Sequence, residues 1–306
     1  MVLFVSGRTD ILSYYSKWFI NRIKEGYVDT RNPYNPLLVS RIYFKDVDII
    51  VFCSKNPHPF LKYLDDIDKL LPNIPLIFHI TLTPYKEDIE PLIGKIKKEV
   101  IEDIKYLSKR YGKDKIFIRY DPILKNNKYN INYHLKAFNK VITLLKGCSS
   151  NIVISFIDKY KNVLNNMKYL KLLEFNEEEL NLLAKNFSKI AKENDFNIFT
   201  CGEKYKFLEF GFISGACLSK TYALSLMNSL NKDVKFKKQT NRKNNYCECV
   251  EMVDIGVYNT CLSKCKYCYA NFDEENVNLN MKLHDENSSL LIGKLNKEDQ
   301  IKIRKK

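Results

Sequence analysis

Seven short apolar runs recur along the chain, and longer amphipathic stretches separate them. The runs are rich in β-branched and aromatic residues, which is typical of β-strands. They cover residues 2–6, 47–52, 75–82, 115–120, 151–157, 197–201 and 249–256. Because strand-like and helix-like segments alternate, we expect a parallel sheet with right-handed crossovers.

The amphipathic stretches carry apolar residues at three- and four-residue steps, the spacing of a helix with one buried face. They include residues 11–26, 88–112, 133–147 and 176–194, several of which end at Gly or Asn. Seven strand–helix units in 306 residues predict an α/β fold built as a complete or partial (β/α) TIM-like barrel. No G-x-G-x-x-G pattern follows the first strand, which disfavours a dinucleotide-binding sheet.

The chain is expected to form one domain in two parts. Residues 1–246 form the barrel body, and residues 247–306 supply the last strand, a cysteine-rich loop and a covering segment. The charged stretch 235–249 is the best linker candidate, and after Ala270 the pattern weakens to that of a loop lying over the barrel. No apolar run is long enough to span a bilayer, and the N-terminal residues are typical of a strand, not of a secretion signal. We expect a cytoplasmic protein with no membrane partner.

The charge of the chain is strongly positive, at +14 from 50 basic and 36 acidic residues. Such an excess attracts nucleic acids and anionic surfaces. Most of the basic residues are dispersed lysines, however, and Asn, Ile and Tyr are also abundant, as an AT-rich genome would produce. Only residues 302–306 form a compact basic run. Nucleic-acid binding and the base composition of the genome are therefore both possible explanations of the positive charge.

Cysteines are concentrated in the last third of the chain. In a cytosolic protein such a cluster indicates metal binding or catalysis, because disulfides are rare there. Seven of the nine lie beyond residue 200, namely Cys201, Cys217, Cys247, Cys249, Cys261, Cys265 and Cys268. The last three have the spacing C-x3-C-x2-C, which is one thiolate short of a closed four-ligand site.

This spacing, with Tyr267 before the third cysteine and Asn259 ahead of the first, resembles the signature of radical SAM enzymes. The resemblance implies a [4Fe–4S] cluster on the three cysteines, with S-adenosylmethionine on the open iron and Tyr267 near the adenine. One electron, from a donor such as flavodoxin or ferredoxin, would cleave the sulfonium to a 5′-deoxyadenosyl radical. In that superfamily the loop follows the first strand, whereas here it follows the last. In a closed ring of strands both positions lie on the same catalytic face.

Longer stretches carry a second resemblance, which covers nearly the whole chain. They include "SGRTDI", "VDIIVFCSKNP", "RYDPI" and "VDIGVYNTCLSKCKYCYAN". Together they resemble the bacterial family called domain of unknown function 1848. That family implies a radical-SAM-like cluster near the C-terminus. It leaves the substrate open between a small molecule, a peptide and a nucleic acid.

Charged residues follow several of the expected strands, on the face where barrel enzymes hold their active sites. Arg8 and Asp10 could bind the charged ends of S-adenosylmethionine, because a guanidinium pairs with a carboxylate and a carboxylate with an ammonium. Arg119 and Asp121 could do the same or hold an anionic substrate. The alternative for each pair is a salt-bridged brace at a strand end. No nucleophile elbow, P-loop or H-E-x-x-H motif is present, so no catalytic residue is assigned.

The four remaining cysteines of the last third are also enough for a closed site. We expect Cys201, Cys217, Cys247 and Cys249 to bind an auxiliary Fe–S cluster or a structural zinc. The alternative is that one or two are buried small hydrophobes and no second site exists. Cys247 or Cys249 could also complete a zinc site with the three-cysteine loop. The alternative function is therefore a cysteine-rich zinc or Fe–S protein with nucleic-acid affinity and no SAM chemistry.

Overall fold

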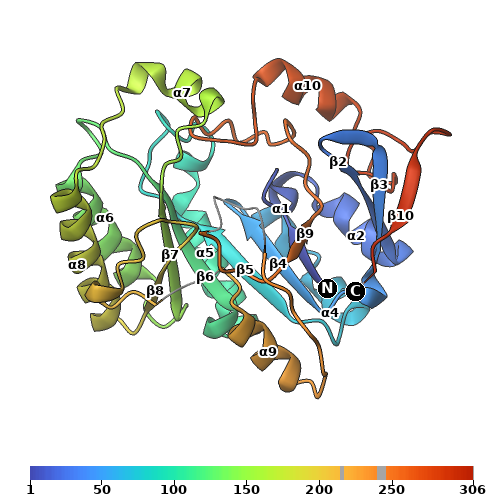
Figure 1. Cartoon of the computed structure of the whole chain (residues 1–306), viewed down its shortest axis with the longest axis horizontal. Coiled ribbons are helices and arrows are strands. Elements are labelled where there is room, and N and C mark those ends of the chain that lie inside the picture. The colour runs from blue at the N-terminus through green and yellow to red at the C-terminus, as the bar shows by residue number, and fades with distance from the viewer. Residues whose placement is uncertain (214–216, 240–245, 306) are drawn as a thin grey trace.

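The centre of the molecule is a seven-stranded parallel sheet with the order β8-β7-β6-β5-β4-β1-β9. The structure is a computed structural model that describes residues 1–213, 217–239 and 246–305 (Figure 1). The strands are β1 (Val2–Val5), β4 (Ile49–Ser54), β5 (Leu76–Thr81), β6 (Ile116–Ile123), β7 (Asn151–Phe156), β8 (Asn197–Thr200) and β9 (Met252–Asp254). Each of the seven predicted strands takes part, so the predicted parallel α/β sheet is confirmed.

The first and the last strand of this sheet, in chain order, pair with each other. β9 pairs with β1 in parallel, with Val2 opposite Met252, as expected if the last strand is a neighbour of the first. Within the described residues the hydrogen-bonded order ends at β8 on one side and β9 on the other. The sheet is therefore open, and the closed form of the predicted barrel is not shown.

Helices cover one face of the sheet. They are α1 (Ile11–Tyr14), α2 (Ser16–Glu25), α3 (His58–Leu61), α4 (Leu64–Leu70), α5 (Lys97–Tyr111), α6 (Ile131–Leu144) and α8 (Glu177–Glu193), whereas α7 (Lys161–Met167) lies at one end of the sheet and packs in the same cluster as Cys265 and Tyr267. The expected helix 11–26 is divided at Tyr15, and the expected helix 88–112 begins only at Lys97. Pro91 accounts for the late start, because proline lacks an N–H and is excluded from a helix interior.

The opposite face of the sheet is covered by the C-terminal third of the chain. Alternate residues of a strand point to opposite faces, so Leu3 and Val5 pack under the helices while Val2 and Phe4 pack against residues from 217–236 and 247–250. This covering segment contains α9 (Lys220–Asn228) and three cysteines. A parallel sheet needs both faces buried, and here the cysteine-rich segment provides the second cover. Residues 240–245 of the expected linker lie outside the described residues.

A smaller three-stranded sheet lies beside the main one. It has the order β10-β3-β2, from β2 (Tyr27–Asn32), β3 (Asn35–Tyr43) and β10 (Gln300–Ile303). The expected covering loop after Ala270 is therefore wrong in part, because it contains α10 (Glu274–Lys282) and β10. An ion pair from Arg31 to Asp299 joins the hairpin to the C-terminal segment. Among the described helices, none has the length and apolar character needed to cross a membrane.

The packing of α6 against α8 gives a test of the core. The rings of Phe138 and Phe187 stack with centroids 3.9 Å apart, and both are fully buried. Phe187→Ala should lower the free energy of unfolding by about 3–5 kcal/mol, because it leaves a cavity beside the remaining ring. Leu182→Ala, on the exposed side of α8, should change it by less than about 0.5 kcal/mol. Denaturant unfolding measures both, and equal effects would contradict this assignment of the core.

Candidate functional site

The cysteine loop starts directly after β9 and passes close to the end of β1. At Gly256 an added Cβ would lie 2.7 Å from the Ser6 hydroxyl oxygen, so only glycine permits this approach. Asn259 adopts a positive φ of 55°, and its backbone N–H donates to the Ala270 carbonyl at 2.9 Å. Its side-chain oxygen accepts the N–H of Phe272. Asn259, predicted as a cofactor-binding residue, thus fastens the two ends of the loop to each other.

The three thiols of the loop lie within range of each other's charge, with Cys265 buried and Cys261 and Cys268 half-buried. Burial raises the pKa of Cys261 to about 12 and also raises that of Cys268. For Cys265, burial is again the largest cause of a raised pKa, and negative charge on Glu90, Cys261 or Cys268 raises it further. Each thiol therefore stays neutral unless a positive group compensates its charge. A bound metal would provide that compensation.

Neighbouring elements fix the shape of this loop. The Tyr15 hydroxyl donates to the Thr260 carbonyl at 2.6 Å, and the Tyr14 and Ser263 hydroxyls lie 2.9 Å apart. Asn162 at the start of α7 donates to the Cys268 carbonyl at 3.1 Å. Figure 1 shows α7 and α10 at the same end of the sheet as this loop. Anchors on both sides make the loop a preorganised site.

Tyr267 is buried in a cluster of charges that the sequence did not reveal. Its hydroxyl donates to the Glu90 carboxylate, which also pairs with Lys97 and lies 3.9 Å from the Lys55 ammonium. The same ammonium lies 5.0 Å from the centre of the Tyr267 ring. Glu90 was concealed within an expected helix, although the proline at position 91 was the signal that this stretch is not helical. The cluster fixes the orientation of the Tyr267 ring.

Arg8 and Asp10 do not pair with each other. The Arg8 guanidinium donates to the Asp254 carboxylate at 3.2 Å and to the Asp254 carbonyl at 2.8 Å. It also lies 5.6 Å from the Tyr258 ring. Arg8 therefore links the segment after β1 to β9, the strand that leads into the cysteine loop.

Asp10 is a helix cap and a brace between strands. Its carboxylate accepts the backbone N–H of Ser13 at 3.1 Å, which caps α1. It also accepts the Ser54 hydroxyl at 2.8 Å and the Lys55 N–H at 2.9 Å, at the end of β4. Burial raises the pKa of Asp10, while these hydrogen bonds oppose the shift. The sequence left two roles for Asp10, binding of S-adenosylmethionine and a brace at a strand end, and the brace accounts for all of these contacts.

Arg119 and Asp121 form a salt bridge with each other, which was the alternative to ligand binding in the sequence analysis. The Arg119 Nε lies 3.1 Å from the Asp121 carboxylate, which also accepts the Ser155 hydroxyl. The Arg119 guanidinium donates in addition to the Cys217 sulfur, at 2.8 Å. The pair thus links β6 to Cys217, one of the four remaining cysteines of the last third of the chain.

The structure brings all four remaining cysteines of the last third together. The sulfurs of Cys201 and Cys217 are 3.3 Å apart, and Cys249 lies close enough to Cys217 and Cys247 for both to raise the pKa of its thiol. Hydrogen bonds from Cys201 and Cys249 lower the pKa of the Cys217 thiol well below its ordinary value, and the charge of Arg119 adds to this effect while burial opposes it. We name Cys201, Cys217, Cys247 and Cys249 the four-thiol group.

His79 lies beside this group and is almost fully buried. Its ring stacks on Phe117 with centroids 4.6 Å apart. Burial lowers its pKa to about 4, so the imidazole is neutral at physiological pH. In the part of the chain that is described, neither ring nitrogen has a hydrogen bond of normal geometry. No metal-ligand spacing in the sequence distinguishes this residue.

As the side chains stand, no three His, Cys, Asp or Glu residues of the described ranges are arranged to hold a metal ion. In the four-thiol group the sulfurs of Cys201 and Cys217 are in hydrogen-bond contact with each other. Thiols must lose their protons before they bind a metal. Metal binding at either cysteine group is therefore a proposal.

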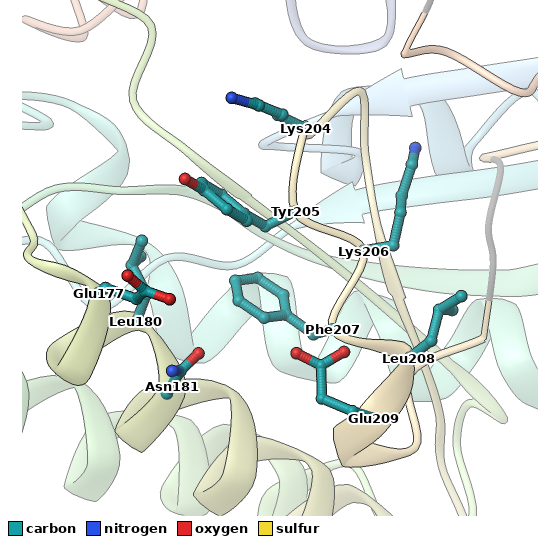
Figure 2. A pocket seen from close by; sticks show the side chains of 9 residues that line it. All are labelled: Glu177, Leu180, Asn181, Lys204, Tyr205, Lys206, Phe207, Leu208 and Glu209. Atoms are coloured by element: carbon teal, nitrogen blue, oxygen red, sulfur yellow. The ribbon is translucent and has the colours of Figure 1, made fainter.

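A surface cavity of about 310 Å³ lies apart from both cysteine groups. Figure 2 shows it between the start of α8 and the segment that follows β8. The rings of Tyr205 and Phe207 stack in its wall with centroids 6.4 Å apart, and Lys204 and Lys206 come from the same segment. No cysteine contributes to its lining.

Comparison with known proteins identifies a family. A family model described as "Domain of unknown function (DUF1848)" matches residues 2–270. No curated protein and no solved structure matches the chain. The family resemblance drawn from the sequence is confirmed, whereas the radical SAM resemblance rests on the sequence motif alone and stays a prediction.

The buried charges around Tyr267 can be tested by Glu90→Gln. The change leaves Lys97 and Lys55 without their shared carboxylate, and we expect a loss of about 3–5 kcal/mol in the free energy of unfolding at pH 7. Glu87→Gln is the matched control, because its pair with Lys95 is exposed and contributes about 0–1 kcal/mol. Denaturant titrations compare the two variants, and a Glu90→Gln variant as stable as the wild type would refute the role given to this cluster.

The same residue makes stability depend on pH. Burial alone would raise the pKa of Glu90, but Lys97 and Lys55 outweigh it and bring the pKa below the ordinary value of 4.5. The stability from ionised Glu90 is therefore present above pH 4.5 and is lost as the pH falls through the lower, folded-state pKa. Unfolding measured across this acidic range should show a component in the wild type that Glu90→Gln lacks.

Proposed function

The chain belongs to the family of domain of unknown function DUF1848, and from this premise we propose that it is a radical SAM-type enzyme. The carrying observation is the anchored loop that follows β9 and holds three cysteines, and not four, within range of each other's charge. In this proposal Cys261, Cys265 and Cys268 hold a [4Fe–4S] cluster. When bound, that group would supply one-electron cleavage of S-adenosylmethionine.

The donor set of the loop fits such a cluster. Iron–sulfur clusters are held by cysteine thiolates, and three thiolates leave a coordination position for another ligand. The three sulfurs are close enough for their charges to repel, and they lie within the field of the Lys55 ammonium. Lys55 would therefore offset the negative charge that accumulates when the thiols ionise.

Other residues of the chain would exclude water and set orientation. Tyr14 and Tyr15 pack against the segment from Thr260 to Ser263 and shield Cys261 from solvent. Tyr267 is fixed through Glu90, so its ring can serve as a rigid wall beside a flat ligand group. In the same proposal Asn259 maintains the loop, and Asp10 positions β4 and Lys55.

Arg8 and Arg119 are the guanidinium groups that the sequence assigned to anionic ligand groups, and each already pairs with a carboxylate of the chain. Arg8 lies at the edge of the site and is partly exposed, so it could bind the carboxylate of S-adenosylmethionine. Arg119 lies deeper, paired with Asp121 on the inner face, and would position a polar substrate or the four-thiol group. The substrate class stays open between small molecule, peptide and nucleic acid.

Cleavage of S-adenosylmethionine tests the proposal directly. The full chain is purified without oxygen, supplied with iron and sulfide, and reduced with dithionite in the presence of S-adenosylmethionine. We expect a brown protein that forms 5′-deoxyadenosine, because the vacant iron position binds and reduces the sulfonium. Chromatography of the small-molecule products measures the yield.

Alanine variants make this test specific. Cys261→Ala, Cys265→Ala and Cys268→Ala should each reduce the yield of 5′-deoxyadenosine to background, whereas Cys148→Ala should retain it. Cys148 is a half-buried cysteine outside both groups and is the matched control. A colourless protein that contains only zinc, or full product formation by the three variants, would refute the proposal. It would leave the alternative of a cysteine-rich zinc protein, to be tested by nucleic-acid binding.

A further inference from the structure

The cysteines of the four-thiol group come from both edges of the central sheet. In the described residues the two edge strands, β8 and β9, do not pair with each other. Cys201 directly follows β8, which is one edge of the central sheet. Cys247 and Cys249 closely precede β9, which is the other edge. Cys217 comes from the C-terminal third of the chain, which covers the sheet face opposite the helices. The four-thiol group therefore contains cysteines from both edges of the sheet.

From this arrangement we infer that Cys201, Cys217, Cys247 and Cys249 bind one zinc ion, which staples the two edges of the sheet together. The site is separate from the three-cysteine loop and does not depend on the proposed SAM chemistry. Four thiolates without an open position are typical of structural zinc sites.

The spacing of the sulfurs favours a single ion over a cluster. Two thiolates that share one tetrahedral zinc, with zinc–sulfur bonds of about 2.3 Å, hold their sulfurs about 3.8 Å apart. The Cys201 and Cys217 sulfurs are 3.3 Å apart as thiols. In a [4Fe–4S] cluster each thiolate binds a different iron, so the cysteine sulfurs are separated by the cluster itself. Binding one ion requires that the thiols lose their protons and that their side chains turn towards a common point, because no three of them are placed around a metal as they stand.

The surroundings of the group supply the outer contacts that a metal site needs. Metal ligands are oriented and tuned by hydrogen bonds from a second layer of residues. Arg119 donates to the Cys217 sulfur at 2.8 Å and is itself held by Asp121. Four thiolates around Zn²⁺ carry a net charge of about −2, and the buried guanidinium offsets part of it.

His79 is an independent observation that points to the same place. Among the described residues, neither nitrogen of this buried imidazole has a hydrogen bond of normal geometry, and the group nearest to providing one is the backbone of Cys217. The ring lies beside Cys217, close enough for their charges to interact. A thiolate of a zinc-bound Cys217 would be a hydrogen-bond acceptor for this ring. The same residue could also replace one thiolate as a ligand.

Metal analysis in a variant without the three loop cysteines tests the inference. The Cys261→Ala/Cys265→Ala/Cys268→Ala chain is expressed with zinc, and its metals are measured by mass spectrometry. We expect one zinc per chain, which further substitution Cys201→Ser should remove and Cys148→Ser should leave. Replacement of zinc by Co²⁺ should give the visible absorption of a tetrahedral thiolate site. Iron with sulfide in this variant, or no metal at all, would overturn the inference.

Thiol protection gives a second measurement in case Cys201→Ser does not fold. Iodoacetamide is applied to the triple-alanine chain with and without a chelator, and labelled cysteines are located by mass spectrometry. The four cysteines should be labelled only after chelation, while half-buried Cys148 should be labelled equally in both conditions. The midpoint of thermal unfolding should fall on chelation. Labelling that ignores the chelator would refute the zinc site, whether or not the wild type cleaves S-adenosylmethionine.

Discussion

The pairing of β9 with β1 is the interaction on which the rest of this site depends. Parallel strands align their carboxyl ends along one edge of a sheet, so the residues after each strand become neighbours. Because Met252 lies opposite Val2, the loop that follows β9 enters beside the segment that follows β1. Arg8 then pairs with Asp254, and Asp10 extends the same link to β4. The cysteine loop is held by this chain of contacts.

Charges buried at this edge are retained in pairs. An ionised group without a partner is costly in a dry interior, so each buried charge specifies the position of another. Glu90 holds Lys97 and Lys55 on one side of the loop, and Asp121 holds Arg119 on the inner face. The strongly basic composition therefore includes a few cations with defined structural positions.

Each cysteine group has a buried cation nearby. Lys55 opposes the effect of burial, which raises the pKa of Cys265 and Cys268, and Arg119 donates to the Cys217 sulfur. Burial raises the pKa of Cys53, on β4, to about 11, and the charges of the same two cations oppose this shift. Each cation thus offsets part of the negative charge that neighbouring thiols would carry when ionised.

The sequence by itself determined the seven strands, the helix faces and the spacing of the three-cysteine loop, because period and spacing are local properties. It did not show β2, β3 and β10, because polar residues interrupt their apolar ones. Nor did it show the role of Glu90, which depends on partners such as Lys55 that are distant in the chain. Only the tertiary structure decided that Cys201, Cys217, Cys247 and Cys249 meet. Contacts between residues far apart in sequence are set by how strands pair and which segment covers a face, and no local pattern records that.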